Sequence, residues 1–197
     1  MNTELKDGQP TFYASNTQAW RDWLADNCHS EKSIWLIIYR KDSGVPSVYY
    51  DEAVDQALCF GWVDSKPNKR DDRSFYQFFA KRNPKSNWSG VNKRKIARLT
   101  EQGLMAEPGL EMVAHAKATG TWDALNDVEN GVIPPDLQAA LAQYPLATSF
   151  FEAFPPSVRR GILEWIFNAK RPETRAKRIA ETARLAQDNI RANQYKK

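Results

Sequence analysis

Proline placement is the feature that most limits how this chain can fold. From about residue 90 onward, apolar residues recur with the period of a helix, and several of these segments begin with proline. Proline at the first helical position costs little, because the amide hydrogen that it lacks would have no partner there. The second half of the chain is therefore predicted to be a series of short helices, at residues 91–102, 108–119, 134–143, 145–154, 156–169 and 172–193.

The first half of the chain has a different pattern. Residues 33–41 are apolar at both alternating positions, which is typical of a strand that is covered on both faces. Residues 62–64 and 74–79 predict a short and a longer, aromatic strand, and helices are predicted over residues 17–27 and 51–60. We therefore expect an α+β fold, with a small mixed or antiparallel, aromatic-rich sheet and helices, followed by an all-helical C-terminal module.

The 197 residues suffice for one large domain or two small ones. We expect a flexible N-terminal tail at residues 1–12, an α+β domain at 13–127 and a helical module at 128–197.

The net charge of +4 is unevenly distributed along the chain. Residues 66–98 hold eleven Lys and Arg against two Asp, a net charge of +9, and residues 170–197 hold nine against three acidic residues, a net charge of +6. The remaining residues are acidic overall. Like charges gathered in this way favour an anionic partner, although a solvated loop and a solvated helix would explain the same runs.

An anion-binding site is predicted where a basic segment meets the start of the helix after Ser89. Basic side chains near a helix N-terminus oppose the helix dipole, whereas an anion bound to the free amides there would be stabilised. We expect this anion to be a phosphate or a carboxylate, with two tryptophans as apolar walls and an aspartate that orients a basic side chain. The predicted pocket consists of Arg82, Lys85, Ser86, Ser89, Asn92, Trp88, Trp62 and Asp64.

Three other interpretations of the same residues stay open. Asp64, Asp71, Asp72 or an acidic helix could neutralise the basic side chains in structural ion pairs. An enzyme acting on a small anionic metabolite could use Asp64 as a base, with Arg82 and Lys85 holding the substrate. Aromatic residues interleaved with Lys and Arg are also found in single-stranded nucleic-acid binding, but the aromatics of 75–79 alternate as in a core strand, and nucleic acid is the least favoured partner.

No metal site, cofactor or catalytic residue is predicted. Two cysteines and two histidines are too few for a zinc site or a disulfide framework, which indicates a reducing, cytoplasmic location. Cys59 falls off the apolar face of its predicted helix, but the neighbouring carboxylates would raise its pKa, so we expect it to be packed rather than nucleophilic. No apolar run is long enough to cross a membrane.

Three ordered motifs resemble the bacterial YdeI/OmpD-associated family, which is also described as bacteriocin-protection. They are Ala57-Leu58-Cys59-Phe60-Gly61-Trp62-Val63-Asp64-Ser65, the set Arg82, Ser86-Asn87-Trp88-Ser89 and Asn92, and the segment from Ala169 to Ile179. The likeness spans roughly residues 11–190. It implies a cytoplasmic stress-tolerance protein, linked to tolerance of bacteriocins or cationic peptides, with a porin or a peptide as possible protein partner. It implies no catalytic residues.

Overall fold

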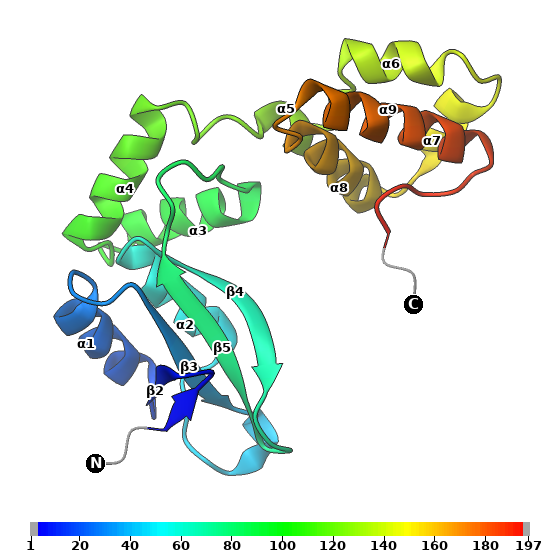
Figure 1. The fold of residues 1–197 in the computed structure, drawn as a ribbon. Coiled ribbons are helices and arrows are strands. Elements are labelled where there is room, and N and C mark those ends of the chain that lie inside the picture. Colours follow the sequence, from blue (N-terminus) through cyan, green and yellow to red (C-terminus); the bar gives the residue numbers. More distant parts are fainter. Residues whose placement is uncertain (1–3, 195–197) are drawn as a thin grey trace. The chain divides into compact units, whose positions relative to one another are not determined.

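The computed structural model describes residues 4–194, and the chain divides into two compact units, residues 1–123 and 124–197. Figure 1 shows a sheet with helices in the first unit and a group of helices in the second. Each unit is described by itself. The predicted domain boundaries at residues 12/13 and 127/128 stay a prediction.

The first unit is built on a five-stranded mixed sheet. Its strands are β1 (Leu5–Lys6), β2 (Gln9–Tyr13), β3 (Ser33–Tyr39), β4 (Trp62–Lys69) and β5 (Ser74–Lys81), in the order β1-β2-β3-β5-β4. β2 and β3 are parallel, and the other neighbouring pairs are antiparallel. The α+β class and the aromatic-rich sheet predicted from the sequence are confirmed.

One face of this sheet carries the core of the unit. Alternate residues of β3 and β5 pair as Ile34 with Phe79 and Ile38 with Phe75, and they pack with helices of the same unit. These helices are α1 (Thr17–Asn27), α2 (Tyr50–Cys59), α3 (Gly90–Glu101) and α4 (Glu107–Ala118). A short 3₁₀ turn, η1 (Lys41–Ser43), follows β3.

The opposite face of the sheet is also apolar, as predicted for a strand covered on both sides. Trp35 and Tyr76 are only 3% and 8% exposed there, and the Lys6 ammonium lies over the Trp35 ring. Arg70 donates to the Glu4 carboxylate at 2.7 Å, and Tyr76 donates to the same carboxylate. The Arg70 hydrogen bond is the main cause that lowers the pKa of Glu4.

Part of the predicted flexible tail is therefore ordered. Residues 5–6 and 9–13 form β1 and β2, and β2 aligns parallel with β3. The alignment depends on a pairing between segments more than 20 residues apart, which local sequence pattern does not reveal. Residues 1–3 of the expected tail lie outside the described residues.

Two glycines allow α4 to approach the end of α2 very closely. A side-chain Cβ at Gly109 would lie 2.1 Å from the Cys59 carbonyl oxygen, far inside contact distance. The Ala106 amide donates to this same carbonyl at 3.1 Å. Gly61 has a φ of +73°, and a Cβ there would lie 3.1 Å from the carbonyl oxygen of Pro108. The turn after α2 is thus held against the start of α4 by backbone contact.

The second unit is entirely helical over its described residues. It consists of α5 (Asn126–Glu129), α6 (Pro135–Leu141), α7 (Ala147–Ala153), α8 (Pro156–Phe167) and α9 (Pro172–Gln187). Its core is a separate cluster that includes Leu137, Phe151, Ile162 and Ala183. The predicted helical module is confirmed, and Pro156 and Pro172 begin helices as expected.

Two local differences from the sequence prediction have clear causes. α5 is a helix that the sequence pattern does not predict, and it forms where Val128 is buried in the helical core. The last helix ends at Gln187 rather than near residue 193, and Asn189 adopts a positive φ of 55°. Ile190, which falls inside the predicted helix of residues 172–193, lies beyond its actual end and is 50% exposed.

The close approach at Gly109 generates a stability prediction. We expect Gly109→Ala to lower the free energy of unfolding by about 3 kcal/mol, because the added Cβ collides with backbone, which cannot move aside as a side chain can. Gly161→Ala is the matched control: it lies inside α8 with nothing within 4 Å of its Cβ position. This change should stabilise by about 0.5–1 kcal/mol. Urea unfolding followed by circular dichroism measures both, and equal effects would contradict the packing described.

Candidate functional site

The hairpin of β4 and β5 places the two central residues of the candidate site. Trp62, the first residue of β4, pairs with Lys81, the last residue of β5. The next residue along the chain, Arg82, donates its backbone amide to the Gly61 carbonyl at 2.9 Å. The antiparallel register thus brings Trp62 and Arg82 together from positions 20 residues apart.

Arg82 is buried without a carboxylate partner. Its side chain is 6% exposed, its guanidinium lies 3.8 Å from the centroid of the Trp88 ring, and it donates to the Asn87 carbonyl. No acidic residue within 4–194 forms an ion pair with it, and its Nε–H has no acceptor. Burial lowers the pKa of Arg82 to about 10, so the buried group is still a cation at neutral pH.

Trp62 provides a second buried donor without a partner. The residue is 0% exposed, and its indole Nε1–H has no acceptor among the described residues. It packs edge-on against Trp23 at 5.8 Å in the aromatic core. The neighbouring Trp20 is different, since its indole donates to the Ala53 carbonyl at 3.0 Å. Buried indole N–H groups usually find such a partner.

Both residues line one pocket of about 460 Å³ in the first unit. In the described part of the chain, three buried side-chain nitrogens lack a partner; two of them are on Trp62 and Arg82, which line this pocket, and the third is on Arg159 of the second unit. We call it the Trp62–Arg82 pocket. Its walls are the end of α1, the turn after α2, the end of β5 and one face of α4, and its lining residues are Cys28, His29, Phe60, Gly61, Trp62, Lys81, Arg82, Pro84, Pro108, Glu111, Met112 and His115.

The lining is mostly apolar, with a few charged groups. Phe60, Trp62 and Met112 offer apolar surface, whereas Lys81 and Arg82 offer positive charge. The Lys81 ammonium donates to the His29 carbonyl at 2.8 Å and is thereby held at the pocket. A concave apolar site with a few fixed polar groups is typical of small-molecule binding. A planar guanidinium and an indole N–H together suit the oxygens of a carboxylate or a phosphate.

The site predicted from the sequence does not include the residues of α4 that line the pocket. Pro108, Glu111, Met112 and His115 recur at the spacing of one helix face, which the sequence does contain. That face packs against the turn after α2 because of the Gly109 contact, and nothing in the local pattern joins it to Trp62.

The predicted site residues divide between several places. Trp62 and Arg82 line the pocket, and Trp88, 2% exposed, stacks on Arg82 and packs against the ring of Trp122 at 5.1 Å. Ser89 is the N-cap of α3, and its hydroxyl accepts from the Asn92 amide at 3.3 Å. The predicted helix start after Ser89 is confirmed, and the Ser89 hydroxyl occupies an amide of the first turn, where an anion was expected to bind.

Lys85 and Ser86 lie on the loop between β5 and α3. The Ser86 hydroxyl donates to the Asn83 carbonyl at 2.7 Å, and the Lys85 amide donates to the Asn83 side chain at 2.9 Å. These bonds form a local turn. Lys85 is exposed, and neither residue lines the Trp62–Arg82 pocket.

Asp64 does not orient a basic side chain as expected. Its carboxylate accepts a hydrogen bond from the Tyr50 hydroxyl at 2.7 Å. Partial burial, with this bond, raises the pKa of Tyr50 to about 12. Asp64 follows Trp62 by two residues on β4 and is not part of the pocket lining. The carboxylate proposed as a base in the enzyme interpretation is therefore paired outside the pocket.

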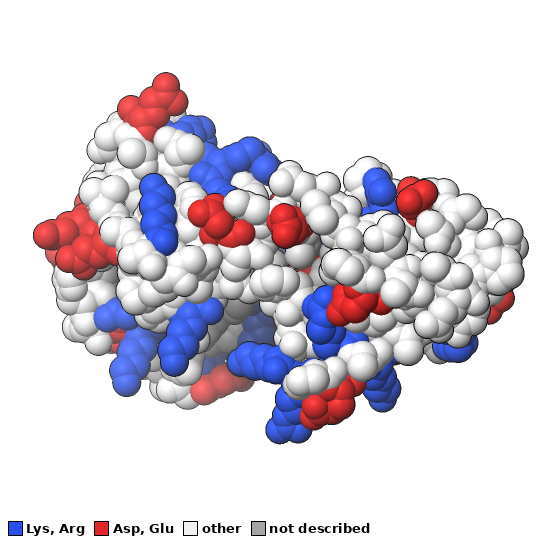
Figure 2. Space-filling view, turned by 90° about the horizontal axis from the view of Figure 1, so that it is seen from above, with Lys and Arg blue, Asp and Glu red and all other residues white. Residues whose placement is uncertain are grey.

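Many basic residues of the segment 66–98 are neutralised by ion pairs. Lys95 and Arg98 of α3 contact the Asp55 carboxylate of α2 at 2.7 and 2.6 Å. Arg70 and Lys69 pair with Asp71 and Asp72. Figure 2 shows basic and acidic side chains as neighbours on the face in view. The ion-pair interpretation holds for these residues. Arg82 differs from them, since it is buried and forms no ion pair with an acidic residue of the described range 4–194.

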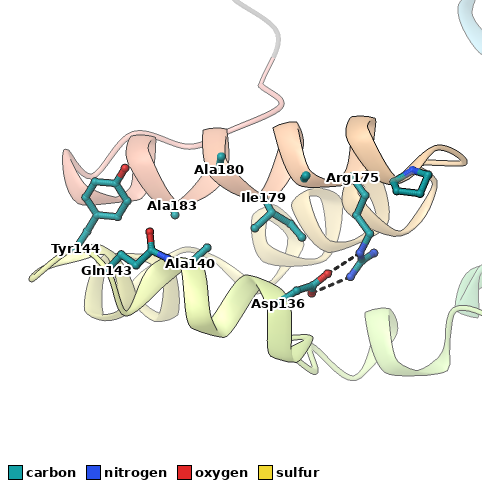
Figure 3. Close-up of a pocket in the computed structure, with 10 residues that line it drawn as sticks. Asp136, Ala140, Gln143, Tyr144, Arg175, Ile179, Ala180 and Ala183 are labelled. Carbon is teal, nitrogen blue, oxygen red and sulfur yellow. Dashed lines mark hydrogen bonds and ion pairs between the residues drawn. The ribbon is translucent and has the colours of Figure 1, made fainter.

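A second pocket, of about 480 Å³, lies between α6 and α9 of the helical unit. Figure 3 shows Ala140 of α6 facing Ile179 and Ala183 of α9, and Ala180 also lines the pocket. At one end the Arg175 guanidinium donates to both oxygens of Asp136, at 2.7 and 2.9 Å, which lowers the pKa of Asp136. The charges here are satisfied within the protein, so this groove lacks the unpaired donors of the Trp62–Arg82 pocket.

The described residues contain neither a metal-binding cluster nor a helix that could span a membrane. Between residues 4 and 194 there is no group of three or more His, Cys, Asp and Glu side chains that could hold a metal ion. None of the helices described combines the length and the apolar character that crossing a membrane requires.

Comparisons with known proteins identify a family for each unit. Residues 12–112 match a domain of unknown function, DUF8412, and residues 130–189 match the family described as Bacteriocin-protection, YdeI or OmpD-Associated. The likeness expected over residues 11–190 is thus confirmed for the C-terminal part, whereas the N-terminal part matches a different domain. Among curated proteins and among solved structures, none matches the chain.

The two cysteines generate a reactivity prediction. Cys28 and Cys59 are free, 5% and 0% exposed, and burial raises the pKa of both thiols. We expect both to react with a disulfide reagent such as DTNB at pH 8 only as fast as the protein opens, because the thiolate is the reactive form. Denaturant should then release two equivalents at once. A thiol that reacts in the native protein as fast as in denaturant would contradict this packing.

Proposed function

We propose that this chain, which belongs to the family of the DUF8412 domain and carries a bacteriocin-protection domain at its C-terminal end, binds a small organic anion in its N-terminal unit. The site is the Trp62–Arg82 pocket. The anion has an apolar body that contacts Phe60 and Met112, and an acidic group that accepts from Arg82 and Trp62.

The single observation that carries this proposal is the buried guanidinium of Arg82 without a carboxylate partner. A buried charge is costly unless it is paired, and an unpaired one calls for an explanation. Two other arginines of the unit have partners: Arg21 donates to the Gln56 side chain and the Leu104 carbonyl at 2.7 and 2.9 Å, and Arg98 pairs with Asp55. An anionic ligand at the pocket would supply the missing charge.

For the cellular role we propose tolerance of bacteriocins, in agreement with the family of residues 130–189. A cytoplasmic location, and a porin or a peptide as protein partner, also stay proposals. Binding of a small anion is the biochemical activity that the N-terminal unit would contribute to this role.

The two other function classes have less support. Nucleic-acid binding by stacking needs accessible rings, whereas Phe79 and Tyr76 of β5 are 0% and 8% exposed. Catalysis with Asp64 as a base would need this carboxylate at the pocket, and it pairs with Tyr50 instead.

Arg82→Met tests the proposal directly. We expect the wild-type chain to bind 3-phenylpropionate, and the variant to bind it about 10- to 100-fold more weakly, because hydrogen bonds to a charged group contribute about 1.5–3 kcal/mol. The free energy of unfolding without ligand should change by no more than about 1 kcal/mol, since an apolar side chain of similar size replaces an unpaired buried charge. Isothermal titration calorimetry and urea unfolding measure the two effects.

Lys85→Met is the matched control for this experiment. It removes the same charge from the same segment, but at an exposed position outside the pocket lining. Its affinity for 3-phenylpropionate should equal that of the wild-type chain. Equal losses in both variants would mean that general charge attraction drives binding. No loss in Arg82→Met, or no binding by the wild-type chain at millimolar concentration, would overturn the proposal.

The cellular role has its own test. Expression of the full chain in a bacteriocin-sensitive strain should raise the concentration of bacteriocin that inhibits growth, relative to the empty vector. An unchanged inhibitory concentration, with the protein shown to be present, would contradict a role in tolerance.

A further inference from the structure

The lining of the Trp62–Arg82 pocket includes an acidic residue, Glu111, as well as the cation Arg82. Glu111 lies on the α4 face that lines the pocket, one helical turn before His115. Its side chain is exposed, and no ion pair of Glu111 is present among residues 4–194. One pocket therefore combines an unpaired buried cation with an unpaired carboxylate at its accessible wall.

Apolar side chains make up much of the remaining lining. Phe60 comes from the end of α2, Trp62 from the start of β4, Met112 from α4, and Pro84 from the segment after β5. A ligand that complements the whole pocket thus needs three parts: an anionic group for Arg82, a cationic group for Glu111 and an apolar body.

We propose that the Trp62–Arg82 pocket binds a free amino acid with an apolar side chain, whose carboxylate accepts from Arg82 and Trp62 and whose ammonium donates to Glu111. This inference rests on the proposed function, the binding of an organic anion, and names the class of that anion. The volume of about 460 Å³ is in the range of small-molecule pockets.

The charges around the pocket favour a zwitterion over a dianion. The second negative charge of a phosphate dianion would face the Glu111 carboxylate, and like charges brought together are penalised. A simple amine would meet Lys81 and Arg82, with His29 and His115 also in the lining. A zwitterion satisfies both signs of charge.

A matched set of ligands tests this inference on the full chain by isothermal titration calorimetry at pH 7. The set has four members. Phenylalanine carries both the ammonium and the carboxylate, and 3-phenylpropionate lacks the ammonium. In N-acetylphenylalanine the amine is neutralised, and phenethylamine lacks the carboxylate. We expect phenylalanine to bind about fivefold more tightly than 3-phenylpropionate, as for an exposed ion pair worth up to about 1 kcal/mol. N-acetylphenylalanine should bind more weakly than phenylalanine, and phenethylamine should not bind.

The variant Glu111→Gln isolates the ammonium contact. It should weaken phenylalanine binding about fivefold and leave 3-phenylpropionate binding unchanged or tighter, because a repelling carboxylate is removed. Glu107→Gln is the matched control, since Glu107 is an exposed acidic residue of the same helix that does not line the pocket. It should leave both affinities unchanged.

The outcomes separate this inference from the proposed function. If 3-phenylpropionate binds through Arg82 but phenylalanine binds no more tightly, or Glu111→Gln affects neither ligand, the amino-acid inference is overturned and anion binding stands. N-acetylphenylalanine that binds as tightly as phenylalanine would overturn it too, in favour of a peptide C-terminus. If no carboxylate of the set binds, both proposals fail.

Discussion

The contact between the backbone of α4 and the backbone at the end of α2 positions the segments that form the Trp62–Arg82 pocket in the N-terminal unit. Gly109 permits it, since any side chain at this position would collide with the Cys59 carbonyl. The same contact fixes the turn that contains Gly61, and the Gly61 carbonyl accepts a hydrogen bond from the Arg82 amide. Three segments that form the pocket are therefore connected through the backbone rather than through adaptable side chains, which favours a preorganised site.

The basic segment 66–98 shows how one charge pattern can have two physical outcomes. Lys95 and Arg98 of α3 both pair with Asp55 of α2, at distances below 3 Å. Arg82 is buried against Trp88 instead, and its guanidinium donates to the Asn87 carbonyl. A buried charge without an ion-pair partner is costly, and it is therefore more informative about function than surface ion pairs, which contribute little on average.

The two units differ in how they use their polar groups. In the helical unit, Asp136 and Arg175 satisfy each other at the end of an apolar groove. In the N-terminal unit, Arg82 and Glu111 line one pocket and neither has an ion-pair partner among the described residues. The family that links the chain to bacteriocin protection covers the helical unit, whereas the pocket belongs to the unit whose domain has no described function.

The sequence by itself determined the elements whose signals are local. Asn16 and Ser89 begin helices because their side chains accept an amide of the first turn. Gly61 ends α2 because it adopts a positive φ, and the double-sided apolar pattern of β3 predicts burial on both faces. Arg82, Trp62 and Trp88 could be named as candidates on the same local basis, since basic and aromatic residues gather there.

Only the tertiary structure decided which of these residues meet. β2 pairs with β3, and the α4 face of Glu111 and Met112 reaches the pocket, through contacts between distant segments that no local pattern encodes. Asp64 pairs with Tyr50 and Lys95 with Asp55 for the same reason. Charge and periodicity determine what a side chain can do, whereas backbone register and close packing determine which partner lies within reach. For this reason Arg82 is buried against Trp88, with no acidic partner among the described residues.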